Sequence, residues 1–329
     1  GYCFYRDARL RRLTRYRYNN CPVDQEGFHI YIKDGKTVWN PGWQPTKTEL
    51  DRYTCRHGLG YSVIEGQKNG VSAAQTLLVP QGENCLLIRL CLKNETDIKK
   101  TLDVFPYVEF CLWDAMDDSS NFQRNFSIGE VELESEAIYH KSEYRERRNH
   151  YAVLWANRPY DGFDTARDAF IGPYGSPALP EAVASGCCTG SIAHGWAPVG
   201  AMQFHLELCP GESQELFFGL GYVENPEGEK FSAPGVINKT RAHTMIETYR
   251  TAAQFDAAAD ALRGYWDTLL SHYHAETGDE KVDRMVNIWN QYQCMVTFNM
   301  SRSASYYESG TGRGMGFRDS CQDLLGFVH

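Results

Sequence analysis

The sequence lacks several features that would assign it to common functional classes. No run approaches the roughly 20 consecutive apolar residues that a membrane-spanning helix needs. Basic residues are outnumbered, with 33 Lys and Arg against 42 Asp and Glu, so the net charge of −9 disfavours nucleic acid or an anionic membrane as main partner. None of the 11 cysteines forms a CxxC pair or a metal-like Cys/His cluster. We therefore expect no metal site, and we expect residues such as Cys91 to be small buried hydrophobes in a reducing compartment.

Apolar and aromatic residues are abundant and suffice for a large core. Hydrophobic residues make up 42% of the chain, with 7 Trp, 20 Tyr and 16 Phe, and the length of 329 suggests two domains. Alternation predicts strands in "CLLIRLCLK" (85–93) and "MQFHLEL" (202–208), which would each place four apolar side chains on one face. Because turn sequences such as "PQGEN" and "KNETD" separate these segments, we predict a large antiparallel β-sandwich over residues 1–237.

The pattern becomes helical after this region. Apolar spacing predicts a helix over 242–274, and Thr277 of "TGDE" is expected to cap a second helix by reaching toward Glu280. That helix would carry apolar residues at intervals of three and four, namely Met285, Ile288, Trp289, Tyr292 and Val296. We predict a helical linker over 238–300 and the start of a helical domain over 301–329. Since the first residues look strand-like and the last look helical, we expect a piece of a longer polypeptide.

An arginine-rich stretch, "YRDARLRRLTRYRY" (5–18), stands near the start of the chain. Arginine interleaved with tyrosine is typical of surfaces that bind single-stranded nucleic acid. Arg15 and Arg17, however, alternate with Tyr16 and Tyr18 as on a strand with one charged face. We favour a buried salt-bridge network or a domain interface, because the chain as a whole is acidic.

A second segment combines tryptophan, glycine and histidine in "WNPGWQPTKTELDRYTCRHGLGY" (39–61). Trp39 and Trp43 could stack on a sugar ring. We favour packed tryptophans and a tight turn in which His57 is hydrogen-bonded.

A polar loop, "WDAMDDSSNFQRNFSIGE" (113–130), is expected after a strand. Amides and a guanidinium supply the donors and acceptors that sugar hydroxyls need, with Gln123 and Arg124 as examples. Phe122 and Phe126 would anchor the loop. It is either a ligand-contacting loop or a solvated one.

The last candidate is the glycine-rich segment "ESGTGRGMGFRDSCQD" (308–323). Its spacing fits neither a dinucleotide fingerprint nor a GxxxxGK phosphate loop. Glycines let the backbone approach a ligand closely, and arginine and aspartate bind hydroxyl groups. Arg313 and Asp319 could therefore hold a sugar, whereas Arg318 and Asp323 could instead pair with each other across one helical turn.

Several of these long segments resemble the cellobiose phosphorylases of the inverting disaccharide phosphorylase family, glycoside hydrolase family 94. They include "YCFYRDARLRRLTRYRYNN", "TCRHGLGY", "NFQRNFSIGEVE" and "GRGMGFRDSCQDLLGFVH". The resemblance implies an antiparallel β-sandwich of the galactose-mutarotase-like kind, a helical linker and the truncated start of an (α/α)6 barrel. It also implies a cytoplasmic homodimer that uses no cofactor and converts cellobiose and phosphate to α-glucose 1-phosphate and glucose. Relatives that act on chitobiose, laminaribiose or cellodextrins, or a non-catalytic carbohydrate-binding sandwich, remain alternatives.

The same resemblance implies roles for individual residues. Arg313 and Asp319 match the family residues that bind the glucose unit destined for glucose 1-phosphate, and Arg302 is a neighbour of that site. Gln123 and Arg124 lie in a loop that would reach the acceptor side. The general acid of the family is an aspartate deeper in the barrel, which is expected beyond His329, so no catalytic residue is assigned here.

Overall fold

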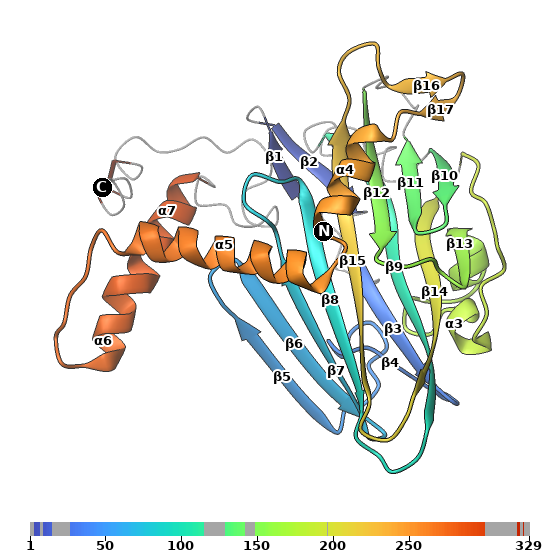
Figure 1. Ribbon diagram of the computed structural model, residues 1–329, viewed down its shortest axis with the longest axis horizontal. Coiled ribbons are helices and arrows are strands. Elements are labelled where there is room, and N and C mark those ends of the chain that lie inside the picture. Colours follow the sequence, from blue (N-terminus) through green and yellow to red (C-terminus); the bar gives the residue numbers. More distant parts are fainter. Residues whose placement is uncertain are drawn as a thin grey trace.

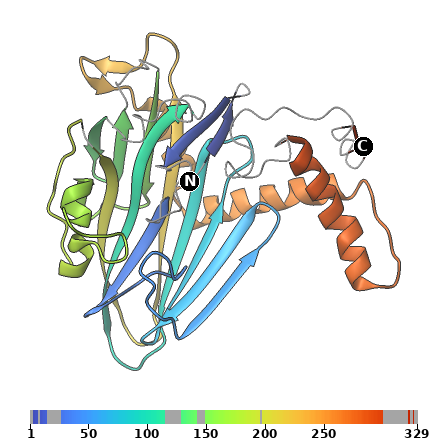
Figure 2. The same cartoon turned by 180° about the vertical axis from the view of Figure 1, so that it is seen from behind.

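Two antiparallel sheets form the body of the molecule (Figure 1). The computed structural model describes residues 3–6, 9–14, 27–114, 129–141, 149–195, 197–299, 321–322 and 325. Apart from two short helices within residues 167–185, the described helices follow the last strand, and the later ones extend away from the sheets (Figures 1 and 2). The predicted β-sandwich followed by helices is confirmed.

The first sheet has seven strands, with the long strand β9 at its centre. Along one edge, β9 pairs with both β2 and β3; β2 also pairs with β1, and β3 also pairs with β4. Along its other edge, β9 pairs with β14, and β14 pairs with β13. The strands are β1 (Cys3–Arg6), β2 (Arg9–Thr14), β3 (Phe28–Asp34), β4 (Thr37–Trp39), β9 (Lys100–Asp114), β13 (Gly162–Ala166) and β14 (Pro198–Leu208).

The second sheet has eight strands in the order β10-β11-β12-β15-β8-β7-β6-β5. The strands are β5 (Arg52–His57), β6 (Tyr61–Lys68), β7 (Val71–Leu78), β8 (Cys85–Asn94), β10 (Glu130–Glu134), β11 (Ala137–Lys141), β12 (His150–Ala156) and β15 (Ser213–Glu224). A separate hairpin joins β16 (Phe231–Ala233) to β17 (Val236–Ile237). Strand β5 is therefore an edge strand of this sheet.

The main core lies between the two sheets. It contains the inward-facing residues that alternation predicted, namely Leu86, Ile88, Leu90 and Leu92 on β8 and Met202, Phe204, Leu206 and Leu208 on β14. Burial of each such side chain contributes about 1.5–3 kcal/mol relative to exposure. The expectation for Cys91 is wrong, because this residue points away from the main core and is only half-buried.

Helices cover the outer face of each sheet. Short helices α2 (Arg167–Ile171) and α3 (Glu181–Ser185) pack on the seven-stranded sheet through Phe170 and Val183. Helices α4 (Thr240–Tyr249) and α5 (Ala252–Leu270) pack on the eight-stranded sheet through Ile246, Phe255, Leu262 and Trp266. The last helical segment is continuous through α6 (Glu280–Arg284), the π-helical turn η2 (Met285–Asn290) and α7 (Gln291–Asn299).

Arg89 fastens helix α5 to the outer face of the eight-stranded sheet. Its guanidinium pairs with Glu215 on β15 at 2.5 Å and with Asp256 on α5 at 2.9 Å. The same group lies over the rings of Phe217 and Phe255, with its central carbon 5.6 and 6.0 Å from their centroids. One side chain thus joins two strands and a helix through charge and cation–π contacts.

Two predictions about helix termini are wrong. The helix predicted over 242–274 is interrupted at Arg250, because Thr251 and Gln254 form a capping box that starts α5. The next helix is capped by Asp279, whose carboxylate accepts hydrogen bonds from the backbone of Lys281 and Val282. Thr277 instead donates its hydroxyl to Asp283 at 2.6 Å.

Candidate functional site

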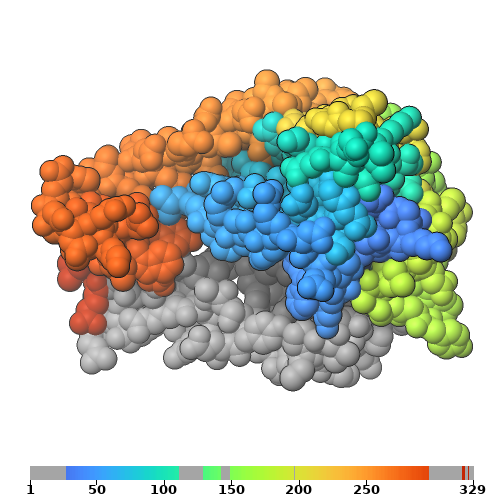
Figure 3. Space-filling model, turned by 90° about the horizontal axis from the view of Figure 1, so that it is seen from below, coloured from blue at the N-terminus to red at the C-terminus, as the bar shows by residue number. Residues whose placement is uncertain are grey.

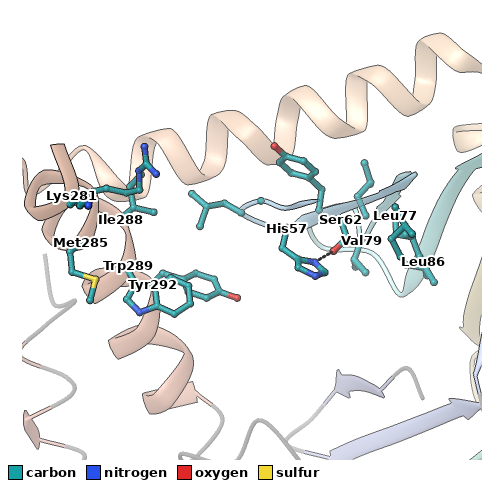
Figure 4. A pocket seen from close by; sticks show the side chains of 17 residues that line it. His57, Ser62, Leu77, Val79, Leu86, Lys281, Met285, Ile288, Trp289 and Tyr292 are labelled. Carbon is teal, nitrogen blue, oxygen red and sulfur yellow. Dashed lines mark hydrogen bonds between the residues drawn. The ribbon is translucent and has the colours of Figure 1, made fainter. Parts of the chain in front are cut away.

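A groove of about 1180 Å³ lies between the β5–β6 end of the eight-stranded sheet and the α6–α7 segment (Figure 4). In Figure 3 the β5–β6 region, in blue, extends toward the orange helices. The sheet side of the groove includes His57, Leu59, Tyr61, Ser62, Ile64, Leu77 and Val79, and the helix side includes Lys281, Arg284, Met285, Ile288, Trp289 and Tyr292. Met285, Ile288, Trp289 and Tyr292 of the predicted apolar stripe therefore line this groove, whereas the side chain of Val296 lies outside the described part of the chain.

The lining combines apolar walls with a few polar groups. Trp289 is 52% exposed and Met285 is 50% exposed, so large apolar surfaces line the space. Lys281 and Arg284 supply positive charge from the helix side, and His57 and Ser62 supply hydrogen-bonding groups from the sheet side (Figure 4). Apolar surface with few polar groups is typical of small-molecule sites.

A tight turn forms the sheet side of the groove. The amide of Gly58 donates to the carbonyl of Tyr61 at 2.9 Å, and His57 Nδ1 lies 2.8 Å from Ser62 Oγ. The favoured interpretation of His57 as a hydrogen-bonded residue beside a tight turn is confirmed. Trp39 is packed in the main core as expected, whereas Trp43 is 43% exposed.

The turn contacts helix α5 at Gly60. This glycine has a φ of +79°, and a Cβ there would lie 2.8 Å from Leu262 Cδ2 and 3.0 Å from Trp266 Nε1. A side chain at this position would therefore be strained, and the side chains of Leu262 and Trp266 would have to shift.

Gly60→Ala is expected to destabilise the chain by about 2–4 kcal/mol, because backbone strain and overpacking combine. Gly82→Ala is the matched control, since Gly82 has a φ of +77° and no atom within 4 Å of its Cβ position. The control should cost only the strain, about 1–2 kcal/mol. Urea unfolding of both variants measures the difference, and equal losses would show that the contact of the turn with α5 contributes nothing.

Two buried carboxylates outside the groove are engaged in structural hydrogen bonds. The fully buried carboxylate of Asp164 accepts hydrogen bonds from the backbone and hydroxyl groups of Thr189 and Ser191. Glu109 accepts a hydrogen bond from Tyr107 and pairs with Arg167 at 2.8 Å. Because these carboxylates are enclosed and paired, they brace loops rather than face the groove.

The predicted sugar-binding residues lie outside the described part of the chain. This holds for Arg302, Arg313 and Asp319, and also for Gln123 and Arg124. The nearest described elements are β9, which ends at Asp114, β10, which begins at Glu130, and α7, which ends at Asn299. The roles of all five residues remain predictions.

Within the described ranges, no group of three or more His, Cys, Asp or Glu side chains is arranged to hold a metal ion. Among the same residues, no helix has both the length and the apolar character that a membrane crossing needs.

Comparison with protein-family models assigns the chain. The model of the glycosyl hydrolase 94 supersandwich domain matches residues 1–252. The chain belongs to glycosyl hydrolase family 94. The catalytic-domain model of the same superfamily matches residues 265–329. The sheet side of the groove therefore belongs to the segment that matches the supersandwich domain, and its helix side belongs to the segment that matches the catalytic domain.

Two phosphorylases with similar sequences agree with this assignment. The family-94 chain is 32% identical to an N,N'-diacetylchitobiose phosphorylase of Vibrio furnissii over all of its own length and 40% of the relative. It is 29% identical to a solabiose phosphorylase of Paenibacillus borealis, covering 90% of this chain and 36% of that protein. A bacterial glucoamylase complexed with acarbose has a TM-score of 0.46 at 13% identity, covering 74% of this chain and 32% of that one. The chain thus spans about 40% of the length of the first of these relatives.

Proposed function

We propose that the whole protein is a disaccharide phosphorylase that cleaves a β-linked disaccharide with phosphate and inverts the anomeric carbon. The observation that carries this proposal is the whole-chain similarity, at 32% identity, to an N,N'-diacetylchitobiose phosphorylase. The consecutive matches to the family-94 sandwich and catalytic domains support it.

The substrate we propose first is cellobiose, with α-glucose 1-phosphate and glucose as products, because the sequence motifs resemble cellobiose phosphorylases. A second candidate is N,N'-diacetylchitobiose. It is favoured by two N,N'-diacetylchitobiose phosphorylases that are 32% and 30% identical to this chain in alignments that cover all of it. Both substrates are β-linked disaccharides of glucose-type rings. They differ because N,N'-diacetylchitobiose carries acetamido groups where cellobiose carries hydroxyl groups.

The reaction needs fewer protein groups than hydrolysis does. An inverting hydrolase uses one carboxyl group to protonate the leaving oxygen and another to activate water. Phosphate is already an anionic nucleophile, so the site must hold its charge and supply the proton donor. In this proposal Arg313 and Asp319 hold the donor sugar, with Arg302 beside them. Gln123 and Arg124 contact the acceptor sugar, and the general acid lies beyond His329. The proposed assembly is a homodimer.

Assay of the whole protein with phosphate against cellobiose, N,N'-diacetylchitobiose and laminaribiose tests the proposal. We expect phosphate-dependent release of glucose 1-phosphate from cellobiose. The corresponding N-acetylglucosamine 1-phosphate from chitobiose would instead select the second candidate. Omitting phosphate is the control, since a phosphorylase should then release no free sugar. Disaccharide binding without phosphate-dependent cleavage of any substrate would contradict the proposal and would favour a non-catalytic binding module.

A further inference from the structure

A chain of three side chains at the edge of the groove contains a thiol and a base. Cys55 and His57 lie on the same face of edge strand β5, because side chains two residues apart on a strand point the same way. Cys55 Sγ lies 3.3 Å from His57 Nε2. His57 Nδ1 lies 2.8 Å from Ser62 Oγ, the contact that Figure 4 marks with a dashed line. The register pairs His57 with Ser62 across β5 and β6.

This geometry is that of a nucleophile, its base and a group that orients the base. If Nδ1 donates its proton to Ser62, Nε2 is left as the acceptor that faces the thiol. The thiol can then transfer its proton to His57, and the resulting thiolate lies beside an imidazolium. Burial and an interaction with Cys55 raise the pKa of the Tyr53 phenol, which lies on the same face of β5. The charged groups that line the groove from the helix side are Lys281 and Arg284, and both are cationic.

Two other exposed cysteines, Cys187 and Cys209, have different surroundings. The thiol of Cys187 donates to the carbonyl of Cys188 at 3.2 Å. The backbone amide of Cys209 donates to Glu212 Oε2 at 2.7 Å, so an acidic side chain lies beside this cysteine. Buried Cys85 has its pKa raised to about 12 by burial and by the charge of Glu83, so it should be inert.

We propose that Cys55 is a thiol–disulfide exchange site for low-molecular-weight disulfides, with His57 as its base. Cys55 transfers its proton to His57, and the thiolate attacks one sulfur of the disulfide. A bond forms between Cys55 and that sulfur, the original disulfide bond breaks, and its electron pair leaves on the released thiolate. Cys55 is exposed, and the adjoining groove of about 1180 Å³ leaves room for the attached group.

Labelling of the reduced whole protein tests the site. A substoichiometric amount of dithiobis(nitrobenzoate) is added near neutral pH, and peptide mass mapping then locates the mixed disulfide. A second series uses glutathione disulfide. We expect Cys55 to react about tenfold faster than Cys187 and Cys209. Equal rates at these cysteines, or no label at Cys55, would overturn the proposal without any variant being needed.

The role of His57 has a separate readout. His57→Gln should slow the reaction of Cys55 about tenfold near neutral pH, whereas at about pH 10 the variant and the parent should react alike because hydroxide can then take the place of the base. Cys55→Ser should remove the fast phase, and Cys209→Ser, as the matched control, should leave it intact. Circular dichroism checks that each variant is folded. An unchanged neutral-pH rate in folded His57→Gln would show that the imidazole is not the base.

Discussion

Phosphorolysis by the whole protein is expected to fall by two to three orders of magnitude when Arg313 is replaced by alanine or Asp319 by asparagine. In the proposed function these side chains bind the sugar that carries positive charge in the transition state. Loss of one partner of a buried, charged hydrogen-bonded contact costs about 3–5 kcal/mol, and each ~1.4 kcal/mol is a factor of ten in rate. The measurement is the initial rate of sugar 1-phosphate release, with kcat and KM determined separately.

Arg263→Ala is the matched control for this experiment. Arg263 lies on α5, is 69% exposed and pairs with Asp260, so its loss should leave phosphorolysis unchanged. Thermal unfolding should show that all three variants are folded. If Arg313→Ala or Asp319→Asn retained near-normal phosphorolysis, that residue would be removed from the proposed site. The family assignment would stand, because it rests on the domain matches and the relatives.

The β-sandwich could be predicted because its strands follow a simple physical rule. Side chains on a strand alternate between faces, so Leu86, Ile88, Leu90 and Leu92 mark a buried face without knowledge of their partners. Helix termini were harder, since the apolar spacing continues across the break at Arg250. The capping box of Thr251 and Gln254 was the available signal for that break. At the next helix, Thr277 and Asp279 compete as caps, and the carboxylate is the acceptor that the backbone uses.

The groove could be predicted only in parts. The helix stripe of Met285, Ile288 and Trp289 was visible from its spacing, but not the sheet edge that it faces. His57 was recognised as hydrogen-bonded beside a turn, whereas its contact with Ser62 depends on the register between β5 and β6. A register is set by long-range packing, which short patterns do not encode. The sugar-binding residues rest on loop motifs without periodicity, so they remain predictions from resemblance.

One buried histidine should make the stability of the chain depend on pH. His140 on β11 lies between the two sheets, is 1% exposed and stacks on Phe110 of β9 with ring centroids 5.2 Å apart. Burial lowers the pKa of His140 from 6.5 to about 3, although a hydrogen bond with the backbone of Glu130 opposes this shift. Its Nδ1 atom has no hydrogen-bond partner among the described residues. The neutral imidazole is therefore the form that the core accepts.

The direction of the pH effect follows from which state binds the proton. Between about pH 3 and 6.5 the unfolded chain protonates His140 and the folded chain does not, so acid favours unfolding. The free energy of unfolding should fall by about 1.4 kcal/mol for each pH unit below 6.5. Carboxylates with lowered pKa add their own losses at lower pH. Burial would raise the pKa of Glu132, but hydrogen bonds from Lys239, Lys141 and the backbone of Ile237 keep it below 4.5. Between pH 7 and 5 these carboxylates contribute little, and the contribution of His140 is the difference between the parent and a variant at this position.

His140→Phe is expected to remove this dependence and to be more stable than the parent by about 2 kcal/mol at pH 5, because an aromatic ring keeps the contact with Phe110 without a basic nitrogen. His194→Gln, at a histidine whose side chain is 84% exposed, is the control and should keep the slope of the parent. Urea unfolding midpoints measured at intervals between pH 7 and 5 provide the comparison. The prediction would be contradicted if the stability of the parent did not change between pH 7 and 5, or if the stability of His140→Phe fell with the same slope. Either result would show that the folded chain does not exclude the proton from His140.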